Sequence, residues 1–465
     1  MSKISNNLGE GSIGKLLFQL ATPAIIAQLV NVLYNIVDRI FIGRIANGEV
    51  AMAGIGVATP VVLIISAFSA LIGGGGAPLA AIKMGEKDID SAEKIMSNSF
   101  SLLIRIGIGL TILFMIIKEP VLWAFGASQS TIGYASEYLG MYLIGTICVQ
   151  ISLGMNSFIN TQGFAKIGMM TVAIGAIINI ILDPIFIFGF DMGVRGAALA
   201  TITGQTISAL WALKFIFGKK SILKIRKEYL KLDMNIVKKV TGLGLAPFIM
   251  QSTESLVLIA LNTRLQMYGG DLAIGAMTIM SSISQIILMP TMGITQGAQP
   301  IMSYNYGAKR IDRVLKTFKL CITCTFMYTS LMFALIMIMP ETFVKVFNGD
   351  PALLEITVWS MKIYFAGVFT MGIQVSCQQT FLSLGQAKTS LFLAMLRKIV
   401  ILIPLIFILP NLFEDKLFAV LLAQPIADVV AISITAIVFI QYYRNNLSKQ
   451  LKVEETQTKE SLNLE

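Results

Sequence analysis

The sequence predicts an all-α membrane protein whose twelve transmembrane helices form two pseudo-symmetric bundles of six. Three observations predict this fold. Of the 465 residues, 55% are hydrophobic and 13% are charged, whereas about a quarter of the residues of soluble proteins are charged. Apolar stretches of about 20 residues, long enough to cross about 30 Å of hydrocarbon, recur along nearly the whole chain. Short motifs also return at one constant spacing.

The apolar stretches give the positions of the twelve spans. In the first half we expect spans at residues 16–41, 52–82, 93–117, 132–160, 167–188 and 193–217. In the second half we expect them at residues 240–266, 271–302, 317–339, 353–383, 389–410 and 417–442. The residues before the first span are polar, which predicts a retained anchor rather than a cleavable signal peptide.

Lys and Arg are distributed unequally between the two sides of these spans. One side carries Lys83, Lys94, Arg310 and the basic residues of 219–239, whereas the other carries few, among them Arg44. By the positive-inside rule, both termini are expected in the cytoplasm. The formal net charge of +10 is therefore explained by topology, and we do not expect nucleic acid as a partner.

The constant spacing divides the chain into two similar lobes. Between the second and eighth spans, six residues recur 222 positions later: Pro78, Gly85, Lys87, Ile89, Asp90 and Lys94 reappear as Pro300, Gly307, Lys309, Ile311, Asp312 and Lys316. Each repeat contains six spans, an even number, so the repeats should be parallel and related by an axis along the membrane normal. Substrates of proteins built in this way bind between the repeats.

This division gives an N-terminal lobe at 1–218, a cytoplasmic amphipathic linker at 219–239, a C-terminal lobe at 240–443 and a polar tail at 444–465. The linker alternates basic and apolar residues. That pattern resembles an interfacial helix, but we favour a solvated linker held against anionic membrane lipid. We expect the tail to be disordered, because it lacks apolar residues to bury.

Ionisable side chains within the spans are few and are functional candidates, because each costs several kcal/mol at membrane depth. Asp38 and Asp183 lie late in two outward-running spans and should reach similar depths. Asn179 precedes Asp183 by one helical turn, and Thr201 on the sixth span could join them. This oxygen-rich set suits Na⁺ or protons. In the alternative, Asp38 pairs with Arg39 and merely ends its span.

The second lobe does not repeat the acidic pair. Glu254 lies mid-span near Gln251, and could contact a cationic substrate, bind a second ion or form a structural hydrogen bond. Arg397, Lys398 and Asp428 lie equally far from the hairpin turn between their spans. We expect these three to form a structural buried ion pair, with a gating role as the alternative.

Other chemistries are not indicated. The chain has no His, and Cys321 and Cys324 form a CxxC pair without a second pair, so a zinc or redox site is not expected. The glycine run at 73–76 lacks the Gly-Lys-Ser/Thr ending of a phosphate loop and instead predicts close helix packing. We expect no cofactor apart from a coupling ion and no nucleotide-binding domain.

Two segments resemble a known family. TPAIIAQLVNVLYNIVDRIFIG in the first span and NIILDPIFIFGFDMGVRGAALATITGQ across the fifth and sixth spans resemble the multidrug and toxic compound extrusion (MATE) transporters. The chain is most similar to the bacterial branch whose ion site lies in the N-terminal lobe. That resemblance implies roles for Tyr34 and Asn156 around the cavity of Asp38 and Asp183, in addition to Asn179 and Thr201.

Glu254 matches an acidic position that another branch of this family uses in its C-terminal lobe. That branch also carries an Asp in the tenth span, where this chain offers Gln374 instead. The resemblance therefore does not extend to a complete cation site in the second lobe.

The resemblance implies a function that we state as an expectation. The protein would be a secondary antiporter, not an enzyme. It would export amphipathic, often cationic, drug-like compounds in exchange for H⁺ or Na⁺, and so confer multidrug resistance. We expect it in the bacterial inner membrane, as a monomer surrounded by lipid. The first alternative is a lipid-linked oligosaccharide flippase of a related two-lobed fold, which would need a cationic cavity for a pyrophosphate. The second is a membrane enzyme, for which no acidic cluster is visible.

Overall fold

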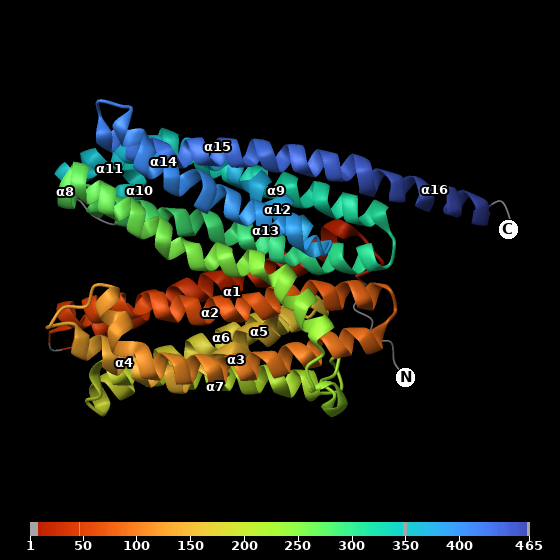
Figure 1. Ribbon diagram of the computed structural model, residues 1–465, viewed down its shortest axis with the longest axis horizontal. Helices are drawn as coiled ribbons and strands as arrows, with labels where there is room; N and C mark the ends of the chain where they lie inside the picture. The colour runs from red at the N-terminus through yellow and green to blue at the C-terminus, as the bar shows by residue number, and fades with distance from the viewer. Residues whose placement is uncertain (1–7, 46, 347–350, 463–465) are drawn as a thin grey trace.

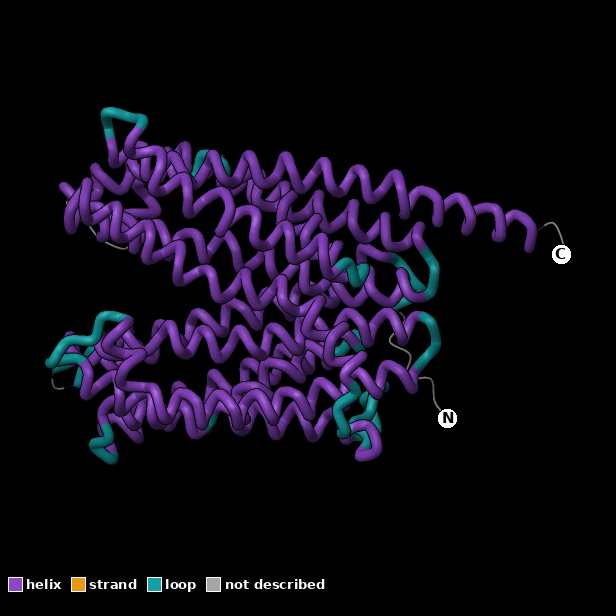
Figure 2. The backbone as a smooth tube through the Cα atoms, in the orientation of Figure 1, coloured by secondary structure: helices purple, strands orange, loops and turns teal. Residues whose placement is uncertain are grey.

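The structure is a computed structural model, and it describes residues 8–45, 47–346 and 351–462. These residues are almost entirely helical, and no strand occurs among them (Figure 2). The helices divide into two lobes that lie side by side, with α1 to α7 in one lobe and α8 to α15 in the other (Figure 1). The predicted fold class is confirmed.

The first lobe contains seven α-helices. They are α1 (Ile13–Ile42), α2 (Gly48–Gly85), α3 (Ile89–Ala124), α4 (Ile132–Ile144), α5 (Thr146–Thr161), α6 (Ala165–Pro184) and α7 (Gly193–Phe217). A π-helical turn, η1 (Ile185–Gly189), follows α6 directly.

The second lobe begins with the long helix α8. Its helices are α8 (Met234–Gly307), α9 (Ile311–Ile338), α10 (Pro340–Lys345), α11 (Pro351–Tyr364), α12 (Met371–Ser383), α13 (Ala387–Met395), α14 (Ile403–Ile408) and α15 (Lys416–Tyr442). Short turns connect them: η3 (Val368–Thr370), π-helical η4 (Leu396–Leu402) and η5 (Leu409–Asn411). Beyond this lobe, π-helical η6 (Tyr443–Leu447) leads into α16 (Ser448–Leu462).

Several predicted spans are broken or joined in the structure. By length and composition, nine helices of the described chain can cross a membrane, and two bent pairs raise the number to eleven. α8 covers two of these spans, because Gly270 breaks it with a φ of 63°. α4 and α5 are bent by 60° within the predicted fourth span, and α11 and η3–α12 by 47° within the tenth. α7 occupies the predicted sixth span and is not among the eleven.

The sequence repeat is also visible in the backbone. The bends of the fourth and tenth spans fall at Gly145 and Gly367, which are again 222 positions apart. Four residues related by the repeat have positive φ angles at the ends of helices: Lys87 (62°), Lys309 (58°), Gly163 (84°) and Gly385 (71°). The two lobes therefore share their turns and bends as well as their spans.

The lobes pack closely where α2 crosses α8. A Cβ on Gly85 would lie 1.9 Å from the carbonyl oxygen of Tyr304, and one on Gly307 would lie 1.9 Å from that of Ile82. The glycine run at 73–76 lies against α5 and α8, with similarly short clearances. Small residues allow helix backbones to approach in this way, so the predicted role of the run in packing holds.

The close contacts gather at one end of the molecule, which we call the terminal end. The start of the described chain and the start of α16 both contact the first turns of α9 there. The ribbons of the two lobes meet near this end and diverge towards the other (Figure 1). The lobes are therefore closed together at the terminal end.

The predicted amphipathic linker is different in the structure. Residues 218–233 contain only one 3-10 turn, η2 (Lys227–Tyr229), and the last six residues of the predicted linker are the first turns of α8. The reason is that side chains of the first lobe bind its backbone. Gln162 Oε1 accepts hydrogen bonds from Ile222 N at 2.7 Å and Leu223 N at 3.0 Å. The segment therefore needs no helix to satisfy its N–H groups.

The expectation of a disordered tail is wrong for residues 444–462, which are helical. Leu447 is fully buried against Ile311, Val314 and Leu384, and Leu451 packs beside it. Two leucines four residues apart lie on one face of a helix, and this small apolar stripe docks the first turns of α16. The polar composition of the tail conceals this contact.

Candidate functional site

The two membrane-depth acids of the first lobe lie together. Asp38 on α1 is 9% exposed, Asp183 at the end of α6 is fully buried, and their carboxyl groups lie within hydrogen-bonding reach of each other. Asn179 Nδ2 donates to Asp183 Oδ1 and to Thr201 Oγ1, at 3.2 Å in both cases. The structure thus brings the four predicted ion-site residues together from α1, α6 and α7.

Local backbone features position Asp183. Pro184 follows it and lacks an N–H, so the α-helical hydrogen-bond pattern is interrupted and the chain continues as η1. One turn earlier, α6 and α7 approach so closely that a Cβ on Gly204 would lie 2.6 Å from the carbonyl oxygen of Gly175. This close approach holds Asn179 and Thr201 within reach of each other.

Three oxygens of this cluster have no donor among the described residues. They are Asp38 Oδ1, Asp183 Oδ2 and Asn179 Oδ1, and all three are buried. A buried oxygen without a hydrogen bond costs free energy, and two carboxyl groups in contact repel each other when both are ionised. A proton or a Na⁺ ion would satisfy these oxygens, since hard cations prefer carboxylate and amide oxygens.

A small cavity of about 30 Å³ adjoins the acids and has room for about one water molecule. Tyr34, Asn179 and Thr201 line it, together with Asn31 and Gln205. The predicted placement of Tyr34 beside the ion site agrees with the structure.

Two further tyrosines were missed by sequence reasoning. Tyr138 and Tyr142 on α4 are buried, stack with ring centroids 6.4 Å apart, and lie within the electrostatic influence of Asp38 and Tyr34 respectively. Their four-residue spacing predicts a shared helix face. It does not reveal which helix that face meets, so no sequence signal could have placed them at this site.

Asn156 lines a second cavity, of about 60 Å³, rather than the one beside the acids. Its Oδ1 is buried without a donor among the described residues. This cavity also contains Gln28 from α1 and Gln296 from α8, which form a hydrogen bond of 3.4 Å between the lobes. The second cavity therefore lies at the junction of the lobes and is lined by uncharged amides.

The charged residues of the second lobe form two separate pairs. Arg397 Nη2 lies 2.7 Å from Asp428 Oδ1, and Gln424 also donates to this carboxylate. The prediction that Lys398 joins this pair is wrong, because Lys398 instead pairs with Glu254. Consecutive helical residues project in different directions, so Arg397 and Lys398 cannot both face Asp428 on α15.

Lys398 is held by α8. Its ammonium group also donates to the carbonyl oxygen of Met250 at 2.9 Å. The Lys398 side chain is only 13% exposed, whereas that of Glu254 is 68% exposed. Gln251 lies partly buried on the same turn of α8. Within the described ranges, no cluster of three His, Cys, Asp or Glu side chains could hold a metal.

Comparison with known proteins explains this arrangement. The model of the MatE family matches residues 23–185 and again residues 247–408, one match for each lobe. The chain belongs to the MatE family. The predicted family is therefore confirmed, and the double match is what the internal repeat requires.

Curated relatives in this family are exporters. The chain is 26% identical over 427 residues to the multidrug export protein MepA of Staphylococcus haemolyticus, covering 91% of this chain and 94% of the relative. It is 25% identical over 426 residues to MepA of Staphylococcus aureus strain N315, covering 90% and 93%.

Solved structures agree with this assignment. The MATE multidrug transporter DinF-BH, solved in complex with the dye rhodamine 6G, is 35% identical, with a TM-score of 0.88 over 96% of this chain and 99% of that one. A crystal structure of MATE in the bent conformation shares the fold at a TM-score of 0.89 and 23% identity, over 97% and 99%. The protein is a multi-pass membrane protein of the MATE transporter family.

Proposed function

We propose that this MATE protein is a secondary antiporter that exports amphipathic, often cationic, organic compounds in exchange for H⁺ or Na⁺. The observation that carries this proposal is the contact of Asp38 with Asp183, where three buried oxygens lack donors among the described residues. The names of the relatives support the substrate class, since MepA proteins are multidrug exporters and DinF-BH was solved with rhodamine 6G.

The acid pair supplies a means of coupling. An ion can drive a conformational change only if it binds the two conformations with different affinity. A proton or Na⁺ between Asp38 and Asp183 removes their repulsion, so its arrival changes the preferred packing of α1 against α6. One charge moved across 100 mV supplies about 2.3 kcal/mol, which is enough to sustain a large substrate gradient.

Sidedness follows from charge. The basic residues that favour the cytoplasm, among them Lys83, Lys94 and Arg310, lie in the turns at the terminal end. We therefore assign this end, with both chain termini, to the cytoplasm of a bacterial cell. With the lobes closed together there, the structure corresponds to a state that opens outward. We propose a monomer in lipid, with neither a catalytic centre nor a cofactor.

A lipid-linked oligosaccharide flippase is not favoured. Such a protein needs a cationic cavity for a pyrophosphate, whereas the cavities described here are lined by acids, amides and a tyrosine. The buried cations of the second lobe, Arg397 and Lys398, are already paired with carboxylates.

Dye export from proteoliposomes tests the proposal, with proton and sodium gradients imposed separately. The wild-type chain should concentrate dye under at least one gradient, and Asp38→Asn should not. Asp191→Asn is a matched control, because Asp191 is exposed, lies eight residues after Asp183 and has a positive φ that Asn adopts readily. Accumulation by Asp38→Asn at the wild-type level would refute the coupling role of the pair.

A further inference from the structure

Two segments outside the ion site cross from one lobe to the other at the terminal end. Residues 8–11 lead into α1 of the first lobe, and we call them the N-terminal arm. Residues 224–233 lead into α8 of the second lobe, and we call them the linker arm. Each arm precedes the first helix of its lobe, but each is held by the opposite lobe or joins the two.

The N-terminal arm is bound by a buried arginine of the second lobe. Arg313 on α9 is only 8% exposed. Its guanidinium donates to the carbonyl oxygens of Gly11 at 2.9 Å, Glu10 at 3.2 Å and Leu8 at 3.4 Å. Asn305 adds a hydrogen bond of 2.8 Å to the carbonyl oxygen of Leu8. Hydrogen bonds to a buried charge are stronger than neutral ones, so this contact is a firm one.

Apolar contacts reinforce the N-terminal arm. Leu8 is 2% exposed and belongs to a cluster with Ala298, Ile301 and Met302 of α8. These residues belong to the second lobe, while α1 itself also packs along α6 of the first lobe. If the lobes separated at the terminal end with α1 kept on α6, the hydrogen bonds of Arg313 to the arm would break.

The linker arm is bound by the first turns of α3 in the first lobe. Asn98 is 3% exposed, donates to the carbonyl oxygen of Tyr229 at 3.0 Å and accepts from Asp233 N at 2.7 Å. Asp233 is the N-cap residue of α8. Asn98 therefore ties the first residue of the second lobe to the first lobe.

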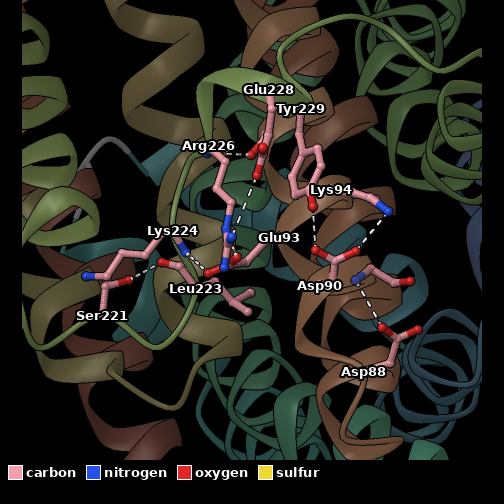
Figure 3. Close-up of polar contacts among 12 residues, drawn as sticks. Asp88, Asp90, Glu93, Lys94, Ser221, Leu223, Lys224, Arg226, Glu228 and Tyr229 are labelled. Carbon is pink, nitrogen blue, oxygen red and sulfur yellow. Dashed lines mark hydrogen bonds and ion pairs between the residues drawn. The ribbon is translucent and has the colours of Figure 1, made fainter.

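Carboxylates of α3 hold the rest of the linker arm (Figure 3). Glu93, which is 3% exposed, accepts from Lys224 N at 3.0 Å and pairs with Arg226. Asp90 accepts from the Tyr229 hydroxyl at 2.5 Å. Lys94 and Tyr229 both hydrogen-bond Asp90 and hold its pKa below the usual range, so it stays ionised at neutral pH.

We propose that the two arms are a pair of latches, closed by Arg313 and Asn98, that hold the lobes together at the terminal end and must release before the lobes open there. The inference rests on the proposed alternating access of the two lobes. The latches are equivalent in position and opposite in chemistry, since a cation grips backbone carbonyls in one, while an amide and carboxylates grip N–H groups and cations in the other.

Distances between spin labels test the latches without reference to transport. Lys166 at the start of α6 and Lys388 at the start of α13 are exposed, related by the repeat, and outside both arms. Labels carried there on unnatural amino acids leave the native cysteines in place. In Arg313→Gln the population at long distance should rise about tenfold, because charge-assisted hydrogen bonds are lost only from the closed state. Lys316→Gln is the control, since it removes a charge from the same helix and Lys316 pairs with Asp312.

Asn98→Ala provides a second, independent variant, which also serves if Arg313→Gln does not fold. It should raise the same population about fivefold, because neutral hydrogen bonds are weaker. An unchanged distance distribution in a folded variant of either latch would overturn the role of that residue. The outcome does not depend on the proposed function: distances can shift in a chain that exports nothing, and an active antiporter can keep its distances.

Discussion

The two lobes treat buried charge in opposite ways. In the second lobe each buried charge has a partner, because Arg397 lies against Asp428 and Lys398 pairs with Glu254. In the first lobe Asp38 and Asp183 face each other, and an oxygen of each lacks a donor among the described residues. Satisfied pairs stabilise one packing, whereas an unsatisfied acidic pair changes its energy when a cation arrives. The comparison teaches that ion coupling belongs to the first lobe.

The largest effect on stability is expected at the paired charges. Asp428→Asn should destabilise the protein by about 3 to 5 kcal/mol, because the buried guanidinium of Arg397 keeps its charge and loses its counterion. Thermal unfolding in detergent measures this. A double variant, Arg397→Met with Asp428→Leu, should recover most of the loss, since it removes both charges. A midpoint unchanged by Asp428→Asn alone would show that the pair is not structural.

The same substitution in the first lobe should have a much smaller effect. Asp183→Asn should leave stability within about 1 kcal/mol of wild type, because it removes a buried acid that repels its neighbour rather than one that neutralises a cation. The same unfolding measurement applies, at a pH where Asp38 and Asp183 compete for protons in the wild-type protein. If Asp183→Asn were as damaging as Asp428→Asn, the contrast between the lobes would be false.

Much of the first-lobe site could be predicted from the sequence. Asn179 and Asp183 are one helical turn apart, and Asp38 is at a comparable distance from the end of its span, so their proximity follows from helix geometry. Tyr138 and Tyr142 could not be placed in the same way. Their contact with the site depends on the packing of α4 near α1, which no local pattern encodes.

The second lobe was less predictable for a related reason. Arg397 and Lys398 lie in the π-helical turn η4, where the directions of consecutive side chains depart from an ideal helix. Equal depth suggested that both meet Asp428, but depth does not give direction around the helix. The linker and the tail were missed because their contacts, through Gln162 and Leu447, depend on distant segments.

The binding of a fluorescent cationic dye such as rhodamine 6G to the purified protein tests the central claim most directly. In the wild-type protein, dye affinity should fall as either protons or Na⁺ are added, because the cation and the dye favour different states of the acid pair. In Asp183→Asn, the affinity should no longer respond to that cation. An equal response in Asp183→Asn and in wild type would show that the cation acts elsewhere and would contradict the account.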